Sequence, residues 1–317
     1  MADNLALQWQ AVTFAVQHGF WMKEKVILHA IDLEVPAGSV LGLVGPNGAG
    51  KTTTLKLGAG LLQPATGQVF IEGLPAIQAR AREPLGLLTE TQYIYPHLRL
   101  KEWLIMMAGL SGLKGARIGT RVAEVLSLLE LSDRADQLMR TLSKGQTQRA
   151  GMAQALLHEP RILLLDEPMS GLDPYWRYRM QKIIQDFKLA GGTIVFSSHI
   201  LVDVERLCDK VALIHDGKLH WQGRLSDMPR SLKGYDAVCH TANPAALEKF
   251  AEGGKIASRP EGGWILTLSP ENKNRLLQMV AEDRIILESL RPIQEEIEEV
   301  LFSFTASVRQ ADRLDLK

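Results

Sequence analysis

The fold follows from one glycine-rich segment, Gly45-Pro46-Asn47-Gly48-Ala49-Gly50-Lys51-Thr52-Thr53. The apolar run 39–44 precedes it, and the helix-forming residues 54–57 follow it. This is the spacing of a phosphate-binding loop between a buried strand and a helix, because glycines let successive backbone N–H groups turn towards an anion. Lys51 is placed to reach the β- and γ-phosphates of a nucleotide, and the Thr52 hydroxyl to bind Mg²⁺. We therefore predict that the whole segment 45–53 contacts a nucleotide.

Length and composition limit the class of protein. The chain has 317 residues, which fits one large α/β domain and a smaller second one. Its 36 basic side chains balance 36 acidic ones, so we expect no nucleic-acid partner held by bulk charge. The two cysteines, Cys208 and Cys239, lack metal-type spacing, which favours two ordinary thiols in a reducing compartment.

Neither a signal peptide nor a membrane span is predicted. Residues 1–5 lack a basic segment followed by an apolar core. The stretch that comes nearest to a membrane segment, 103–113, is too short to cross a bilayer and contains Gly109, Ser111 and Gly112. We therefore expect any membrane association to come through a partner.

The segments around the phosphate loop predict a mixed α/β domain. Residues 5–36 show the alternation of a β-hairpin, with a connecting loop at 17–25. Residues 98–142 are rich in predicted helix, and one helical face there is apolar. The residues on that face are Val122, Val125, Leu126, Leu128 and Leu129. The other elements expected here are a helix from the phosphate loop to about Leu62, a turn at 63–67 and a strand at 68–71.

From residue 161 onward, predicted strands and helices alternate. This order indicates a parallel sheet with helices on its faces. The expected elements are a strand at 162–165, a helix at 175–189, a strand at 193–197 and a β-hairpin at 210–221. The hairpin is expected to turn at Asp216-Gly217, because Asp-Gly between alternating apolar residues is a strong turn signal.

A change in composition indicates a second domain. Residues 226–234 are rich in Pro, Arg, Ser, Lys and Gly, and we interpret them as a linker. The segment 235–317 then has the pattern of a small β-α-β-β-α-β unit. Its helices are expected at 244–252 and 270–282, and an acidic helix from Pro292 to about Phe304 closes it. These residues carry no recognisable chemistry, so we expect a regulatory or dimer-stabilising domain.

Two carboxylates follow the apolar strand at 162–165. Asp166 is placed to hold Mg²⁺ through water, and Glu167 to orient and deprotonate a water that attacks a γ-phosphate. An acidic residue after a strand is also common as a helix cap. The phosphate loop in the same chain favours the catalytic interpretation.

Five motifs in a fixed order give the chain a family resemblance. In order they are the phosphate loop, Leu142-Ser143-Lys144-Gly145-Gln146, Asp166-Glu167, Ser170-Gly171-Leu172-Asp173 and Ser197-Ser198-His199. Residues 5–225 thereby resemble the ATP-binding subunit of ABC transporters, and are most similar to its ABC-2 exporter branch. The resemblance implies a RecA-like parallel sheet with an antiparallel β subdomain and an α-helical subdomain at about 97–142. That domain would span 1–225, before the small C-terminal α+β domain at 235–317.

The resemblance also assigns catalytic roles. ATP and Mg²⁺ are the implied ligands, and Thr52 and Asp166 are the implied metal site. Glu167 and His199 are the implied catalytic residues, with His199 reaching the γ-phosphate. Asp173 would couple two sites across a dimer.

The segment 142–146 corresponds to the family signature. Ser143, Gly145 and Gln146 would begin a helix whose outward N–H groups form a second anion site. One chain cannot fold this site onto its own phosphate loop. In the family, two copies close head to tail around ATP, so the resemblance implies a second copy or a related subunit as partner. Ser143 would also act as a helix cap, because capping and phosphate binding use the same geometry.

Three positions depart from the commonest family pattern. Lys144 replaces the first signature glycine, where its charge either attracts the opposing nucleotide or faces solvent, and we favour solvent. Glu90 stands where a glutamine usually begins the lever loop, and we assign it to the nucleotide site, with Gln92 as the fallback for this role. Val16 stands where the family has an aromatic ring for adenine.

Two nearby rings are candidates for that missing stacking partner. Either Phe20 or Trp21 supplies the ring face, or both pack against the β region. The sequence does not decide between these alternatives.

The resemblance implies an ATPase subunit that powers a transporter. ATP binding would close the dimer and hydrolysis would reopen it, moving substrate through a separate polytopic permease subunit, in the direction of export. We then expect the protein at the cytoplasmic face of the cell membrane, held there by the permease. Four residues either contact the permease or pack between subdomains: Tyr93, Tyr95, Pro96 and Trp103.

Two other function classes are weaker. A soluble ABC ATPase acting on nucleic acid or ribosomes usually carries two nucleotide domains or a long coiled coil, and the sequence shows neither. A nucleotide kinase with a phosphate loop is disfavoured by the signature and by His199.

Overall fold

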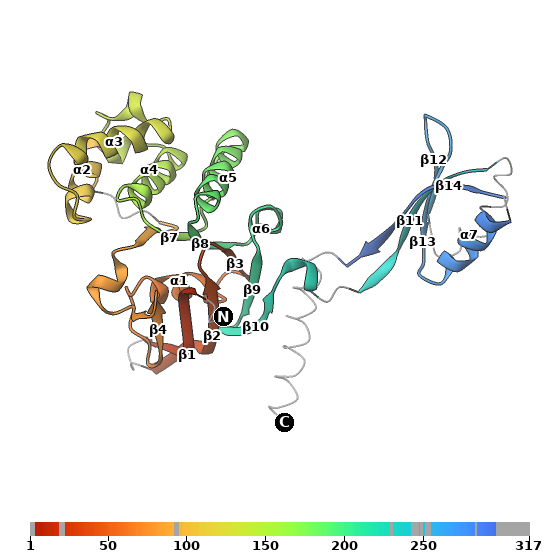
Figure 1. Ribbon diagram of the computed structural model, residues 1–317, viewed down its shortest axis with the longest axis horizontal. Helices are drawn as coiled ribbons and strands as arrows, with labels where there is room; N and C mark the ends of the chain where they lie inside the picture. The colour runs from red at the N-terminus through yellow and green to blue at the C-terminus, as the bar shows by residue number, and fades with distance from the viewer. Residues whose placement is uncertain are drawn as a thin grey trace. The chain divides into compact units, whose positions relative to one another are not determined.

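The computed structural model describes residues 4–18, 23–91, 95–228, 231–241, 247, 250, 255–282 and 284–295. The chain divides into two compact units, Met1–Asp227 and Met228–Lys317. Figure 1 shows the elements of each unit.

A six-stranded sheet forms the centre of the first unit, in the order β10-β9-β3-β8-β7-β6. Its strands are β3 (Val40–Val44), β6 (Leu85–Leu88), β7 (Ile162–Asp166), β8 (Thr193–Ser198), β9 (Lys210–His215) and β10 (Lys218–Gly223). All neighbours are parallel except β10, which pairs antiparallel with β9. Every residue of β3, β7 and β8 is buried, as expected for parallel strands covered on both faces.

The predicted hairpin turn is confirmed. Asp216 and Gly217 have φ angles of +45° and +71°, the left-handed pair that a tight turn between twisted strands requires. Lys218 of β10 pairs with His215 of β9 directly beside this turn.

The helices that contact this sheet include α1 (Lys51–Gly58), α5 (Pro174–Leu189) and α6 (Leu201–Leu207). α1 is shorter than predicted and ends at Gly58 rather than near Leu62. The fully buried indole of Trp9 donates from Nε1 to the carbonyl oxygen of Thr54 at 3.2 Å, which links α1 to the neighbouring antiparallel sheet.

The antiparallel sheet has the order β2-β1-β4-β5. Its strands are β1 (Leu5–His18), β2 (Lys23–Pro36), β4 (Thr66–Ile71) and β5 (Leu74–Pro75), and a 3₁₀ turn at Ala79–Arg82 follows. The connecting loop predicted at 17–25 is shorter, because Gln17 pairs with Glu24 and Val16 with Lys25 inside the ladder. Apolar residues of β1, β2 and β4 share one core with α1 and the parallel sheet.

The helical region contains α2 (Leu100–Leu110), α3 (Ala116–Leu128) and α4 (Lys144–Leu156), with 3₁₀ turns at Ser132–Arg134 and Met139–Thr141. The three α-helices contact one another and lie together in Figure 1. Val122, Val125, Leu126 and Leu129 are buried as predicted. Leu128 is 43% exposed, because its position on the helix turns it away from that face.

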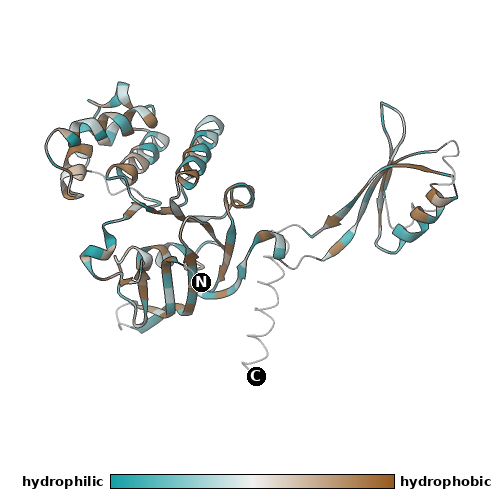
Figure 2. Cartoon of the chain, viewed as in Figure 1, coloured by the Kyte–Doolittle hydropathy of each residue, from teal (hydrophilic) through white to brown (hydrophobic). Residues whose placement is uncertain are grey.

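The second unit is a four-stranded antiparallel sheet in the order β12-β13-β11-β14. Its elements are β11 (Leu232–His240), β12 (Lys255–Ser258), β13 (Trp264–Leu268), α7 (Asn272–Ala281) and β14 (Ile286–Gln294). α7 carries hydrophobic and hydrophilic residues (Figure 2), and its Leu276 is fully buried in the core of this unit. The strand order is that of a split β-α-β unit.

Two boundaries in the second unit differ from prediction. β11 already begins at Leu232, within the range interpreted as linker. β14 continues through Pro292, so an acidic helix does not begin there. Tyr235 pairs with Pro292 at an edge strand, a place that tolerates a proline. The predicted helix at 244–252 and the rest of the acidic helix lie outside the described residues, apart from Leu247 and Phe250, which are buried.

Across the described residues, no helix combines the length and apolar character needed to cross a membrane. The predicted α/β fold, with its parallel sheet, antiparallel β subdomain, helical subdomain and small α+β unit, is confirmed.

Candidate functional site

One cavity of about 480 Å³ collects most of the predicted site residues. This volume is within the range of pockets that hold small molecules. The lining residues come from β2, the phosphate loop, α1 and the ends of β7 and β8: Lys25, Ile27, Asn47, Gly48, Gly50, Lys51, Thr52, Thr53, Glu90, Asp166, Glu167, Ser170 and His199. Segments far apart in sequence therefore meet at the carboxyl ends of parallel strands, where α/β sheets bind ligands.

The phosphate loop joins the end of β3 to the start of α1. At Gly45 a Cβ would lie 2.0 Å from the carbonyl oxygen of Ile214, so only glycine fits between the loop and β9. Gly50 has φ +107° and caps α1 without a side-chain hydrogen bond. The first N–H groups of α1 therefore have no side-chain cap, which leaves donors for an anion. The loop residues Gly45, Pro46 and Ala49 do not line the cavity, and Ala49 is buried in the core instead.

Lys51 is held across its own loop. Its Nζ donates to the carbonyl oxygens of Gly45 at 2.7 Å and Pro46 at 3.0 Å, and the residue is 7% exposed. Burial lowers the pKa of Lys51 below its ordinary value of 10.5, and the charges of Glu167, Asp166 and Glu90 oppose this shift without cancelling it. A phosphate would therefore meet a buried lysine that two backbone carbonyl oxygens hold in place.

Asp166 at the end of β7 and the adjacent Glu167 are tied to β8 through one hydroxyl, that of Ser197. Ser197 Oγ donates to Asp166 Oδ1 at 2.6 Å and accepts from the backbone N–H of Glu167 at 2.9 Å. Asp166 is 3% exposed. Ser197 thus holds the Asp166 carboxylate and the Glu167 backbone next to each other.

His199 pairs with Glu167. Nδ1 of the imidazole lies 2.9 Å from Glu167 Oε2, and because an ionised carboxylate only accepts, Nδ1 is the donor. The side chain of Glu167 is 12% exposed and that of His199 is 56% exposed. The imidazole therefore orients the carboxylate while its other edge stays accessible.

The signature residues do not line this cavity. Ser143 caps α4: its Oγ accepts from the backbone N–H of Gln146 at 3.3 Å, and its own N–H donates to Gln146 Oε1 at 2.8 Å. Gly145 lies beside Gly171, because a Cβ on Gly145 would be 3.2 Å from the carbonyl oxygen of Gly171. Lys144 is exposed in the single chain and its aliphatic carbons lie against Gly171, which is compatible with both alternatives for its charge.

The lever-loop residues, the candidate permease contacts and Asp173 lie in different surroundings. Glu90 lines the cavity, whereas Gln92 and Tyr93 lie outside the described residues. Tyr95 is 54% exposed, but Trp103 is 2% exposed in the core of the helical region, so it packs rather than presents a contact surface. Asp173 caps α5 by accepting from the backbone N–H of Trp176 at 2.9 Å.

The adenine side of the site is only partly described. Phe20 and Trp21 lie outside the described residues, and Val16 is 37% exposed in β1. The sequence interpretation missed Lys25 and Ile27, which line the cavity from β2. The alternation of β2 gave no signal for them, because cavity contact depends on how the antiparallel sheet sits beside the loop.

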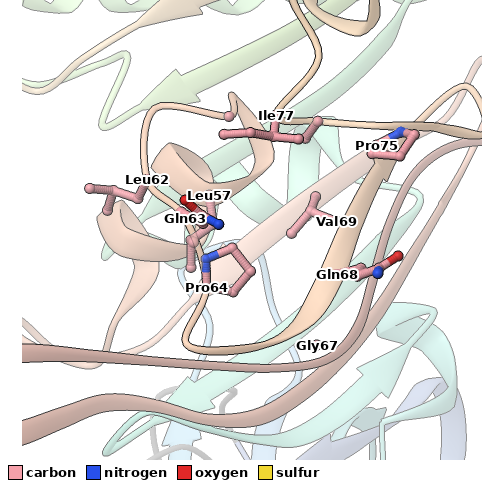
Figure 3. Close-up of a pocket in the computed structure, with 11 residues that line it drawn as sticks. Leu57, Leu62, Gln63, Pro64, Gly67, Gln68, Val69, Pro75 and Ile77 are labelled. Atoms are coloured by element: carbon pink, nitrogen blue, oxygen red, sulfur yellow. The ribbon is translucent and has the colours of Figure 1, made fainter.

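A second cavity of about 240 Å³ has a different character. Its described lining contains no titratable side chain: Leu57, Gly60, Leu62, Gln63, Pro64, Gly67, Gln68, Val69, Pro75, Ala76 and Ile77. Figure 3 shows Leu57, Val69 and Pro64 among the side chains around it. These groups offer no acid–base chemistry, so this cavity is not a candidate for the site of reaction.

Known proteins resemble most of this chain. The ABC transporter family model matches residues 28–170. An uncharacterized ABC transporter ATP-binding protein of Nostoc sp. (strain PCC 7120) is 41% identical over 256 residues, covering 80% of this chain and 76% of the relative. The Nod factor export ATP-binding protein I of Cupriavidus metallidurans is 36% identical over 217 residues, covering 68% and 72%. A solved dimeric ATP-binding cassette in a post-hydrolysis state with ADP and Pi superposes with TM-score 0.64 at 23% identity, over 69% of this chain and 98% of that one.

The chain belongs to the family of ABC transporter ATP-binding proteins. It is the ATP-binding, ATP-hydrolysing subunit of an ABC transporter, as the five ordered motifs predicted. The superposed structure, at its low identity, supports the fold.

Proposed function

We propose that Glu167 is the general base for ATP hydrolysis and that His199 holds it in position. The observation that carries this proposal is the network Asp166–Ser197–Glu167–His199, which faces Lys51 in one cavity. Glu167 would accept a proton from the water that attacks the γ-phosphorus, and the bond from that phosphorus to the β-γ bridging oxygen would break to give ADP and phosphate. Lys51 would leave the carbonyls of Gly45 and Pro46 to neutralise the β- and γ-phosphates.

The residues of the phosphate loop would bind the phosphates of ATP. The uncapped N–H groups at the start of α1 would hold phosphate oxygens, together with Asn47, Gly48 and Thr53 around the same cavity. Glu90 lies at this cavity as well, and we assign it to the nucleotide site at the start of the lever loop.

Thr52 and Asp166 fit a Mg²⁺ ion. Both present oxygen atoms to the cavity, and oxygen is the ligand that Mg²⁺ prefers. In the part of the chain that the structure describes, no three His, Cys, Asp or Glu side chains gather into a metal site. This suits Mg²⁺, which takes one or two protein ligands and completes its shell with phosphates and water. When bound, the ion would neutralise phosphate charge.

A second copy of the chain would complete the site. Ser143, Gly145 and Gln146 stand outside the cavity of their own chain, at the start of a helix whose N–H groups can bind an anion. We infer that they close on the ATP held by the phosphate loop of the other copy. The solved cassette described above is itself a dimer.

The closing and reopening of this dimer would drive transport through a separate membrane subunit. We propose a polytopic permease as that partner, which would hold the protein at the cytoplasmic face of the cell membrane. The relative from Cupriavidus metallidurans is named for export of Nod factor, and this favours export as the direction. Both relatives described above carry transporter names, so nothing favours the alternative of a nucleic-acid or ribosome ATPase.

Glu167→Gln tests the assignment of the base. The change keeps the shape of the side chain but removes the basic carboxylate, so we expect ATP hydrolysis to fall by about 100-fold or more. Steady-state phosphate release measures the rate, and equilibrium binding of a fluorescent ATP analogue measures the affinity, which should be retained.

A carboxylate outside the cavity gives the matched control. Glu72 pairs with Arg161 at 2.6 Å and does not line the cavity, so Glu72→Gln should leave hydrolysis near the wild-type rate. Brisk hydrolysis by Glu167→Gln would show that another group takes the proton.

A further inference from the structure

Gln148 connects the signature helix to the backbone of Glu167. It lies in α4 shortly after Gln146 and is 4% exposed. Its side-chain Nε2 donates to the carbonyl oxygens of Glu167 at 3.1 Å and Pro168 at 3.2 Å. Carbonyl oxygens only accept, so only the NH₂ end of the amide can face them, and its two protons serve one carbonyl each.

These hydrogen bonds act on a residue whose backbone is in a disfavoured region. Glu167 has φ +48°, the left-handed conformation that side chains with a Cβ rarely adopt. Such a conformation persists where its surroundings hold it, and it is common in active sites. The carbonyl oxygen of Glu167 also accepts from the backbone N–H of Ser170 at 3.0 Å, so Gln148 adds a side-chain restraint to a local turn.

Three side chains restrain Glu167 from different directions. Ser197 holds its N–H from β8, and His199 holds its carboxylate from the segment after β8. Gln148 holds its carbonyl from α4, the helix that Ser143 caps. Of the three, Gln148 alone comes from the helical region.

We propose that Gln148 is a positioning residue for Glu167 and that it ties the direction of the carboxylate to the first turn of α4. The inference rests on the proposed role of Glu167 as base. A displacement of the signature turn would reach the Glu167 backbone through one buried amide. ATP held against Ser143 by a second copy would therefore influence the base in the other site of the dimer.

Gln148→Met tests this role, because methionine has similar length and volume but no donors. We expect kcat for ATP hydrolysis to fall about tenfold or more, since small misplacements of a catalytic group are costly, while KM for ATP changes less than about twofold. Gln148→Asn keeps a buried amide on a shorter stem that cannot reach both carbonyls. It should lower kcat in the same way, and it keeps the test valid if the methionine variant fails to fold.

Gln181→Met is the matched control. Gln181 is also buried, at 7% exposure, and donates from Nε2 to Asp203 Oδ1 at 2.8 Å in the packing of α5 against α6. Both variants lose hydrogen bonds from a buried amide, so both should lower Tm. Only the Gln148 variants should lower kcat.

The outcomes separate this inference from the proposed function. If the Gln148 variants keep kcat as well as Gln181→Met does, Gln148 is structural and the inference is overturned, whatever Glu167→Gln shows. If Glu167→Gln hydrolyses ATP at the wild-type rate, the assignment of the base fails. A low kcat in the Gln148 variants, a normal kcat in Gln181→Met and an inactive Glu167→Gln together support both.

Discussion

Helices α1 and α4 both begin at glycine-containing motifs, yet their first turns are satisfied differently. α1 begins after Gly50 with no side-chain cap. α4 begins after Ser143, which exchanges hydrogen bonds with Gln146 in a capping box. The first turn of α1 opens into the cavity with Lys51 and the carboxylates, whereas the signature residues line no part of it.

From this difference we infer different functions for the two proposed anion sites. The proposed site at α1 has first-turn N–H groups without a side-chain cap and a buried lysine, so we expect it to bind phosphates in a single chain. The site at α4 has part of its donors occupied by its own cap, and a phosphate would compete with that cap. The phosphates of ATP would then bind first at α1, and the α4 helix of the second copy would close on them later.

The largest expected effects come from changing one helix start at a time. Lys51→Met removes the cation, and loss of its charge-assisted bonds should weaken ATP binding by about 30-fold. Ser143→Arg places a long side chain over the signature turn and removes the cap, so hydrolysis should be lost while ATP binding to the single chain is unchanged. Binding of a fluorescent ATP analogue and phosphate release measure the two properties separately.

The contrast would be broken if Ser143→Arg weakened ATP binding as much as Lys51→Met does. Removal of the Ser143 cap should also lower the stability of the fold by about 1 kcal/mol, which a thermal melt can check. A loss of hydrolysis accompanied by a collapse of the melting transition would mean misfolding, and Ser143→Ala then serves as the milder variant.

A smaller expected effect at the α1 site is a dependence of ATP binding on pH through Lys51. In the free protein, burial holds the pKa of Lys51 below 10.5, so the unfolded chain binds more protons than the folded one in the alkaline range up to 10.5. Lys51 therefore opposes folding below its lowered pKa, and this cost is relieved as pH rises through that range. Nearby phosphates raise the pKa again, so ATP binding should take up protons there and weaken as pH rises.

Calorimetric titration with ATP at several pH values in the alkaline range up to 10.5, each in two buffers of different ionisation enthalpy, measures this proton uptake. Lys51→Met should abolish the difference between the two buffers. Equal proton uptake by the wild-type protein and by Lys51→Met would assign the titration to another group.

The sequence predicted the central sheet and most of the cavity. The all-apolar run 162–165 is typical of a buried parallel strand, and the motif order then puts Asp166, Glu167 and His199 at the same sheet edge. The hairpin turn at Asp216-Gly217 was also predictable, because Asp and Gly readily adopt the left-handed φ angles that this turn requires.

The remainder depends on tertiary contacts that no local pattern encodes. Gln148 is a polar residue on a buried face of α4, and its role becomes visible only when the end of β7 lies against it. Trp103 was a candidate for a partner contact, but packing between the helices buries it. Pro292 resembled a helix start, yet the edge position of β14 accepts it within a strand.

Sedimentation velocity of Glu167→Gln, with and without ATP and Mg²⁺, decides whether the nucleotide site is divided between two copies. Without nucleotide we expect monomers. With ATP, which this variant should bind and not hydrolyse, we expect dimers, and Ser143→Arg in the same chain should keep the protein monomeric although ATP is bound. Monomers at saturating ATP, or dimers that form equally well with Ser143→Arg, would contradict a site completed by the signature of a second copy.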